Sequence, residues 1–215
     1  VDIFDEEINS LKYYWFKPFK LNGIDLLVSR TGWSSELGYE IFLLNSKDGD
    51  KLYQTIMESG QQMGLKPGHT STIRRIEGAM LSYHADMDIN TNPFELGLDR
   101  FIDIDRDFDF VGKEALIEIK RKGVNRQQVG LEIKSDPMPG PNTRFWEIKI
   151  KDSTLGKVTS AVYSPRLKKN IALAMLEKRY SKIGTEVQVI SESDILPAEV
   201  VEKPFFDPAK TVTKS

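Results

Sequence analysis

Lys122-Gly-Val-Asn-Arg-Gln127 is the stretch where the sequence pattern of the chain changes. Beyond it, short alternating apolar and polar runs recur at roughly ten-residue spacing, which is typical of an all-β sandwich or barrel. These runs are 129–133, 146–150, 156–163, 171–176, 186–190 and 198–201. The stretch itself is polar and contains a glycine, as domain boundaries commonly do. We therefore predict two domains, residues 1–122 and residues 123–215.

Residues before this stretch combine strand and helix patterns. The turn pair Asn22-Gly23 leads into a predicted strand at 24–29, and a second strand at 39–44 pairs with it as a hairpin with a long connection. Apolar residues at helical spacing predict helices over 48–63, 69–83 (capped by Thr70 or Ser71) and 112–122, the last with Ala115, Leu116 and Ile119 inward. Residues 101–104 read as a short strand. The fold class is therefore α+β, with an α/β unit followed by a small antiparallel β-barrel.

Composition narrows the classes of function. The chain has 215 residues, 30 basic and 32 acidic, and a formal net charge of −2, so it has no electrostatic signature of a nucleic-acid or membrane partner. It contains no cysteine, which excludes disulfides and a cysteine nucleophile. No apolar run approaches the ~20 residues that span a bilayer. The acidic start, Val1 to Glu7, lacks Met and resembles the interior of a longer protein rather than a signal peptide.

The most informative segment is Arg30-Thr-Gly-Trp-Ser-Ser-Glu-Leu-Gly-Tyr-Glu-Ile41. A loop with two glycines joins the two predicted strands and presents Arg30, Trp33, Glu36 and Glu40. A carboxylate accepts two N–H bonds from an amidine-like edge, and an indole stacks on a flat ring, so this set suits a nitrogen-rich heterocycle. The alternative is a surface hairpin in which Trp33 covers the core and Glu40 is solvated.

The same segment closely resembles the Arg-Thr-Gly-Tyr-Thr-Gly-Glu-Asp-Gly-Phe-Glu-Ile signature of the glycine-cleavage T-protein family. Similar features follow in the same order over nearly the whole chain. Any one of them is weak, but the ordered set is specific. They are Arg75-Ile-Glu-Gly-Ala-Met-Leu-Ser-Tyr83, Asp86-Met-Asp88, Asn92-Pro-Phe-Glu-Leu-Gly-Leu98, Asp109-Phe-Val-Gly-Lys-Glu-Ala-Leu116, Gly156-Lys-Val-Thr-Ser-Ala161, Ser164-Pro165, Ile171-Ala-Leu-Ala174, Gly184-Thr185 and Pro204-Phe205.

The resemblance implies a tetrahydrofolate-dependent transferase of methyl or aminomethyl groups. In this family the last Glu of the signature binds the amino-pyrimidine edge of the pterin, which maps to Glu40, and the signature aromatic lines the pocket, which maps to Trp33. The upstream aromatic pair maps to Tyr13 and Tyr14, and Arg30 opens the same loop. The Trp variant resembles the dimethylsulfoniopropionate demethylase branch, which uses a sulfonium donor. The resemblance therefore implies a small donor that is either an amine, as in the aminomethyltransferases, or a sulfonium. A cytoplasmic location is expected.

Three departures from the family pattern matter. Ser71-Thr72 stands where the family has Arg-Asp, and His84 stands where it has Gly. The catalytic Asp of the family lies upstream, so no residue here is assigned a catalytic role, and a missing N-terminal part of the same protein is the expected partner. A non-catalytic folate-binding or regulatory relative is therefore the alternative function. A β-barrel interaction module is a third, weaker interpretation.

Other chemistry-bearing residues have simpler interpretations. A metal site would need His69 and His84 with Asp86 and Asp88, but carboxylates in turns usually cap backbone, and no metal is predicted. Arg166, near Tyr163, could face a ligand cleft, although a surface turn is the simpler interpretation. Lys168-Lys169 fits a solvated turn better than a phosphate site.

Overall fold

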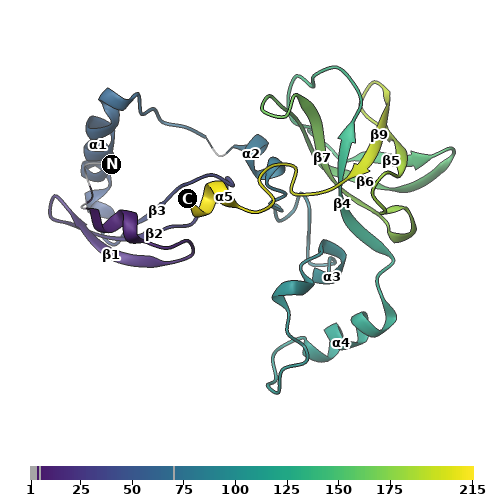
Figure 1. The fold of residues 1–215 in the computed structure, drawn as a ribbon, viewed down its shortest axis with the longest axis horizontal. Coiled ribbons are helices and arrows are strands. Elements are labelled where there is room, and N and C mark those ends of the chain that lie inside the picture. Colours follow the sequence, from purple (N-terminus) through teal and green to yellow (C-terminus); the bar gives the residue numbers. More distant parts are fainter. Residues whose placement is uncertain (1–3, 5, 70) are drawn as a thin grey trace. The chain divides into compact units, whose positions relative to one another are not determined.

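The computed structural model describes residue 4, residues 6–69 and residues 71–215. The chain forms two compact units, Val1–Ser71 with Ala209–Ser215, and Thr72–Pro208 (Figure 1). Most of the acidic start and the predicted cap at Thr70 lie outside the described residues. The domain division predicted at residue 122 stays a prediction. No helix in the described part of the chain has the length and apolar character needed to cross a bilayer.

The first unit is built on a three-stranded antiparallel sheet in the order β1 (Phe16–Leu21), β2 (Ile24–Ser29) and β3 (Glu40–Leu43). The predicted hairpin between the segments 24–29 and 39–44 is confirmed as β2–β3. Strand β1 was not predicted. The Asn22-Gly23 pair closes the β1–β2 hairpin, and both residues have positive φ (49° and 81°), as a two-residue hairpin turn requires.

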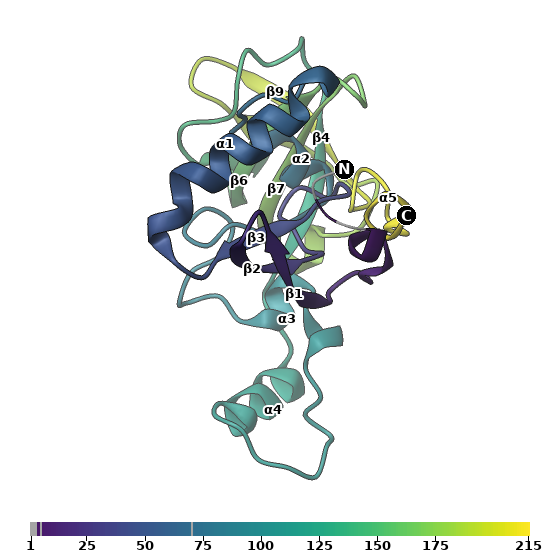
Figure 2. The same ribbon diagram turned by 90° about the vertical axis from the view of Figure 1, so that its left-hand side faces the viewer.

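One face of this sheet forms the core of the unit. Ile24, Leu26 and Val28 alternate along β2 and are 1%, 0% and 0% exposed. The 3-10 helix η1 (Glu6–Ser10) and helix α1 (Gly49–Gly60) cover this face through Ile8 and Leu52 (Figures 1 and 2). The 3-10 turns η2 (Ser46–Asp48) and η3 (Gln61–Met63) flank α1 and complete the predicted helix over 48–63. The short helix α5 (Thr211–Lys214) also belongs to this unit.

The helix predicted over 69–83 is much shorter in the structure, where α2 spans Thr72–Glu77. A Schellman-type cap ends it. The N–H groups of Ala79 and Met80 donate to the carbonyls of Ile76 (2.9 Å) and Arg75 (2.7 Å), and Ala79 has the left-handed φ of 53°. This cap uses Ala where Gly is usual, so composition did not signal the stop.

The segment between α2 and the barrel contains α3 (Pro93–Leu96), η4 (Asp99–Phe101) and α4 (Lys113–Lys122). The strand predicted at 101–104 is wrong. The segment begins as a 3-10 turn, and no strand within the described ranges pairs with it. The backbone N–H and C=O groups of a strand there would therefore have no hydrogen-bond partners on a neighbouring strand. Helix α4 agrees with the predicted 112–122, but Ala115 is exposed rather than inward, while Leu116 and Ile119 are half-buried.

Residues 126–201 close into an antiparallel six-stranded barrel in the order β4-β7-β6-β5-β8-β9, which confirms the predicted barrel (Figure 1). Each predicted run falls within a strand. A 3-10 turn, η5 (Lys178–Tyr180), follows β7. The strands are β4 (Arg126–Ile133), β5 (Trp146–Ile150), β6 (Ser153–Ser164), β7 (Lys169–Glu177), β8 (Glu186–Ile190) and β9 (Ile195–Val201).

Alternate residues of each strand fill the barrel. Leu131, Ile148, Val158 and Val189 are each 0% exposed and belong to one apolar cluster. The strands β6 and β7 lie close together at Gly156, where an added Cβ would lie 2.1 Å from the carbonyl oxygen of Met175. Only glycine fits at this point of the barrel wall.

Candidate functional site

Glu40 is the first residue of β3, and its carboxylate is held by a short chain of hydroxyl groups. Thr31 donates a hydrogen bond from Oγ1 to Oε2 of Glu40. The hydroxyls of Ser29 and Thr31 are 2.7 Å apart, and because the Thr31 proton is used toward Glu40, Ser29 must be the donor in that pair. No hydrogen bond from a described residue to Oε1 of Glu40 is found, so the exposed carboxylate keeps acceptor capacity for a ligand.

Aromatic side chains share the sheet face that carries Glu40. Phe16 pairs with Ser29, and Ser29 pairs with Glu40, so these three residues point to the same side of the sheet. Phe42, two residues beyond Glu40 on β3, points to that side as well. Phe16 and Phe42 are 67% and 50% exposed. Neither residue was predicted to lie near Glu40, because β1, which sets this register, was not predicted.

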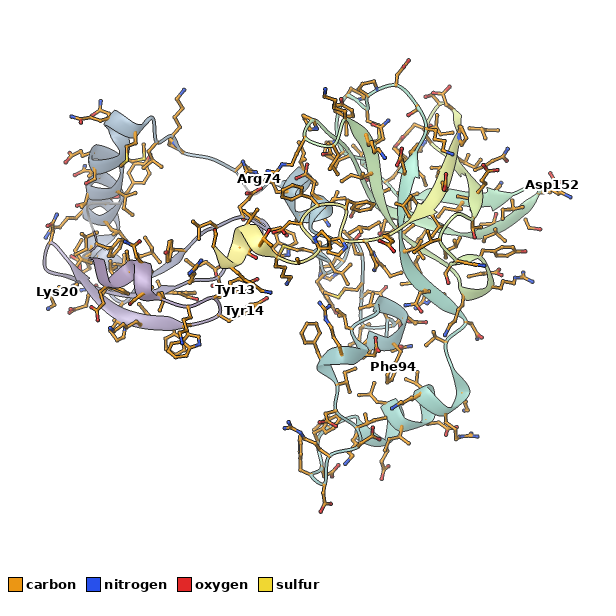
Figure 3. All side chains as sticks on the ribbon, in the orientation of Figure 1. Tyr13, Tyr14, Lys20, Arg74, Phe94 and Asp152 are labelled. Carbon is orange, nitrogen blue, oxygen red and sulfur yellow. The ribbon has the colours of Figure 1, made fainter. Side chains whose placement is uncertain are left out.

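Tyr13 and Tyr14 lie next to each other beside α5, with ring centroids 4.0 Å apart (Figure 3). Burial, with smaller contributions from the Tyr14 hydroxyl, raises the pKa of Tyr13 to about 12, so its phenol is protonated at neutral pH. Tyr14 has a φ of 68°, which is unusual for a bulky residue and stores backbone strain of roughly 1–3 kcal/mol. The pair is therefore held in a defined and costly conformation.

Arg30 ties these tyrosines to the start of the signature loop. Its backbone N–H donates to Trp15 (2.9 Å), and its carbonyl accepts from the N–H of Tyr14 (3.1 Å). Its guanidinium is buried and donates to the carbonyl oxygens of Leu11 (3.1 Å), Thr213 (3.5 Å) and Ser215. Only Nε lacks a hydrogen-bond partner. The Arg30 guanidinium thus holds the backbone at Leu11 and the backbone of the C-terminal residues Thr213 and Ser215. Its role in cofactor binding stays a prediction.

Trp33 lies in the connection between β2 and β3 and is 39% exposed. Of the other predicted site residues, Tyr13 and Tyr14 are in ring contact, and Arg30 is hydrogen-bonded to the backbone of Tyr14. Glu40 is hydrogen-bonded to Thr31, the residue after Arg30. A shared cavity for Trp33 and Glu40 stays a prediction.

The second unit contains a buried ion pair between Arg75 of α2 and Asp86. Arg75 Nη1 lies 2.8 Å from Oδ2 of Asp86, whose side chain is 0% exposed. The hydroxyls of Thr159 and Ser160 donate to Oδ1 of Asp86 at 2.6 and 2.7 Å. The pairing of β6 with β7 shifts register between Val158 and Ser160, and this bulge lets both hydroxyls reach one carboxylate. The pair fastens the segment 72–86 to the barrel.

The remaining candidates have structural roles. The Asp88 carboxylate accepts hydrogen bonds from the N–H of Asn90 (2.8 Å) and the hydroxyl of Thr91 (3.0 Å). These bonds stabilise the turn, which explains why a carboxylate stands at this position. Arg166 lies 3.6 Å from the buried carboxylate of Glu77 and 4.0 Å above the ring of Phe206. Lys169 pairs with Glu132 at 2.7 Å. In the described ranges, no group of three or more His, Asp or Glu side chains is arranged to hold a metal ion.

Residues 2–106 match the family model of the GCVT N-terminal domain, and residues 126–207 match that of the glycine cleavage T-protein C-terminal barrel domain. The chain belongs to the glycine-cleavage T-protein family. The expected resemblance is therefore confirmed over both parts of the chain. Its assignment to the dimethylsulfoniopropionate demethylase branch is not tested by these matches.

Curated relatives of this T-protein chain carry the name aminomethyltransferase. The protein from Caldanaerobacter subterraneus subsp. tengcongensis is 35% identical over 206 residues, which are 94% of this chain and 54% of the relative. The protein from Clostridium botulinum (strain Okra / Type B1) is 36% identical over 216 residues, 99% of this chain and 57% of the relative. The chain spans about half the length of the curated relatives it matches.

A solved structure has the same fold as this T-protein chain. The crystal structure of glycine cleavage system aminomethyltransferase T from Bartonella henselae superposes with a TM-score of 0.78 at 21% identity, covering 92% of this chain and 53% of that one. Two hydroxyl residues beside Glu40 were not predicted from the sequence, Thr31 within the quoted motif and Ser29 just before it. The register of β2 with β3 places Ser29 opposite Glu40.

Proposed function

We propose that this chain carries the folate-binding part of a one-carbon transferase that moves an aminomethyl or methyl group from a small amine or sulfonium to tetrahydrofolate. The observation that carries the proposal is the pre-positioned Glu40 carboxylate, which keeps acceptor capacity beside exposed aromatic side chains. An amino-pyrimidine edge presents two parallel N–H donors, and a carboxylate accepts both. Family membership supports the same ligand.

The residues proposed to contact the folate are Glu40, Trp33, Tyr13, Tyr14 and Arg30. Glu40 would accept from the pterin, and Trp33 would stack on it. The tyrosine pair would supply a rigid aromatic wall, and a contact from Arg30 would use Nε, the nitrogen that lacks a hydrogen-bond partner. Chemistry in such a site is mainly alignment of donor and acceptor. The donor-facing Asp of the family is expected outside residues 1–215, so we expect no turnover from this chain alone.

The test is equilibrium binding of tetrahydrofolate to the 215-residue chain by calorimetry under reducing conditions. Glu40→Gln replaces one acceptor by a donor that opposes the pterin N–H, so affinity should fall roughly 10- to 100-fold. Glu58→Gln, at an exposed position on α1, is the matched control and should bind as the parent chain does. Equal affinity of the two variants would reject the assignment of Glu40.

A folate-binding relative without transferase activity is the second candidate. Ser71 favours it, because the family has an Arg that contacts the cofactor at this position. Assaying the chain together with its missing N-terminal part, with tetrahydrofolate and aminomethyl-lipoyl or sulfonium donors, distinguishes the two, because only the first candidate expects turnover from that combination. Methylene- or 5-methyl-tetrahydrofolate formed by the chain alone would contradict both the second candidate and the expected location of the catalytic Asp.

A further inference from the structure

The segment Ala209–Ser215 belongs to the first compact unit, although Thr72–Pro208 before it form the second. It contains helix α5 (Thr211–Lys214), which lies beside Tyr13 and Tyr14 (Figure 3). A four-residue helix is far shorter than the roughly 12–15 residues that are only marginally stable alone in water. The segment therefore owes its order to contacts with the first unit, and we call it the C-terminal strap.

The strap is fastened to the guanidinium of Arg30. Arg30 is 8% exposed, and its Nη2 donates to the carbonyl oxygens of Thr213 (3.5 Å) and Ser215. Its Nη1 donates to the carbonyl oxygen of Leu11 (3.1 Å), so two of the three acceptors found in the described residues come from the strap. Hydrogen bonds from a buried charged group are costly to lose, because the group is already desolvated.

Arg30 connects the strap to the tyrosine pair through the backbone. Its carbonyl accepts from the N–H of Tyr14, and its N–H donates to the carbonyl of Trp15. These two bonds continue the β1–β2 pairing beyond Phe16 and Ser29. Tyr14 has a φ of 68°, which a bulky residue keeps only where its surroundings enforce it. The bonds to Arg30 supply part of that enforcement.

The strap also contacts Tyr13 through the side chain of Thr213, which is 7% exposed. Burial is the main cause of the raised pKa of Tyr13, and hydrogen bonding with the Thr213 side chain is a smaller influence that lowers this pKa. The two side chains therefore lie together. Because the ring centroids of Tyr13 and Tyr14 are 4.0 Å apart, the strap restrains the pair at both members, Tyr13 through Thr213 and Tyr14 through Arg30.

We propose that the C-terminal strap positions the Tyr13–Tyr14 pair for the folate and acts mainly through Arg30. This inference rests on the proposed function, in which the pair forms an aromatic wall of the folate site. Without the strap, Tyr14 can leave its strained conformation and the two rings separate. The ligand would then have to order the wall as it binds, which lowers the affinity. The strap residues are positioning residues and not ligand contacts.

The experiment compares tetrahydrofolate binding by the full chain and by a truncated chain that ends at Pro208, using calorimetry. We expect the truncated chain to bind at least fivefold more weakly. The strap carries two charges, on Lys210 and Lys214. The double variant Lys210→Gln and Lys214→Gln keeps the backbone and removes both charges, so it is the matched control and should bind within twofold of the full chain. The apolar core described for the first unit contains no strap residue, so the truncated chain is expected to fold.

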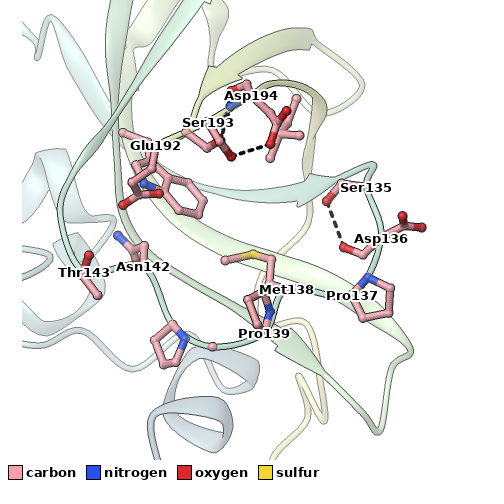
Figure 4. Close-up of a pocket in the computed structure, with 15 residues that line it drawn as sticks. Ser135, Asp136, Pro137, Met138, Pro139, Asn142, Thr143, Glu192, Ser193 and Asp194 are labelled. Atoms are coloured by element: carbon pink, nitrogen blue, oxygen red, sulfur yellow. Dashed lines mark hydrogen bonds between the residues drawn. The ribbon is translucent and has the colours of Figure 1, made fainter.

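A second measurement observes the tyrosine pair without any ligand. In chains that carry carbon-13 tyrosine and nitrogen-15 tryptophan, Tyr13→Phe and Tyr14→Phe assign the two rings. The full chain should show magnetisation transfer between these rings, and the truncated chain should show none. The indole signal of Trp146, which lines the cavity at the barrel end, should not move, and this would show that the barrel stays folded (Figure 4).

A double-variant test shows whether the strap acts through Arg30. Arg30→Lys keeps the charge but cannot donate to all three carbonyls, so truncation in this background should cost less than twofold in affinity. Independent, additive losses would overturn the proposal, and so would ring contact that survives truncation. Equal or tighter binding by the truncated chain would also overturn it, because the strap would then give the ligand no support. Absence of binding by the full chain would reject the proposed function, while the ring contact would still test the strap.

Discussion

The hydroxyl of Thr31 donates a hydrogen bond to the carboxylate of Glu40. The two residues are nine positions apart and lie at the two ends of the signature loop. This bond holds the Glu40 carboxylate in the structure, and we propose that Thr31 positions it for the ligand.

Replacing Thr31 with valine should weaken tetrahydrofolate binding about three- to tenfold, because one hydrogen bond that orients the acceptor is lost while the side-chain volume stays the same. Calorimetry measures the effect. Ser34→Ala in the same loop is the control. An unchanged affinity in Thr31→Val would show that Glu40 needs no support from Thr31.

Replacing Trp33 with alanine should weaken folate binding by about 1–3 kcal/mol if the indole stacks on the pterin, taking aromatic–base stacking as the analogue. Trp33→Phe, which keeps a stacking face, should recover most of that loss. Competition with a fluorescent folate analogue reports both values. Identical affinities for all three proteins would exclude stacking at this position.

Replacing Asp86 with asparagine should destabilise the second unit by on the order of 3–5 kcal/mol, because the buried guanidinium of Arg75 loses its counter-charge. Urea unfolding monitored by circular dichroism gives the difference. Glu118→Gln breaks an exposed helical pair with Arg121 and should change stability little. Equal midpoints for the two variants would contradict the anchoring role of the Arg75–Asp86 pair.

Replacing Gly156 with alanine should destabilise the barrel by about 1–3 kcal/mol or more, because the new Cβ would overlap the backbone of β7 at Met175. Gly140→Ala is the matched control, since nothing lies within 4 Å of a Cβ at that position. Thermal unfolding compares the two. A Gly156→Ala variant as stable as Gly140→Ala would mean that β6 and β7 separate more easily than the structure indicates.

Stability should depend on pH through Lys203. Burial lowers the pKa of this amine from 10.5 to about 8, partly offset by the Asp86 carboxylate. Between pH 8 and 10.5 the unfolded chain binds the proton and the folded chain does not, so stability attributable to Lys203 rises with pH in this window, by on the order of 1–3 kcal/mol.

Unfolding curves of the parent chain and Lys203→Met, measured from pH 7 to 10.5, test this dependence. Their difference in unfolding free energy should change across the window in favour of the parent chain, because the variant has no amine to titrate. Lys182→Met, at an exposed position, should follow the parent chain. A constant difference between the parent chain and Lys203→Met would contradict a lowered pKa.

The alternation of apolar and polar residues, with turn residues between the runs, was enough to predict the barrel. Each alternating run after Gly123 falls within a strand, because period-two alternation with turn residues between runs specifies one buried face per strand. The strand patterns at 24–29 and 39–44 likewise predicted the β2–β3 hairpin, which the observed pairing confirms. Local patterns failed where the deciding interaction was not local. Helix α2 stops at a cap built on Ala79, and residues 101–104 have no partner strand in the described ranges.

The sequence by itself determined the family and the barrel, and it supplied the residues that we propose for the folate site. Only the tertiary structure decided which side chains surround Glu40, since pairing of β1, β2 and β3 aligns Phe16 and Ser29 with it across strands distant in sequence. It also decided how residues 134–145, between β4 and β5, are held: Asn170 donates to the carbonyl of Ser135, and Asn142 accepts from the N–H of Ala161. Register and long-range hydrogen bonds are set by packing of the whole fold, and no local run of residues specifies them.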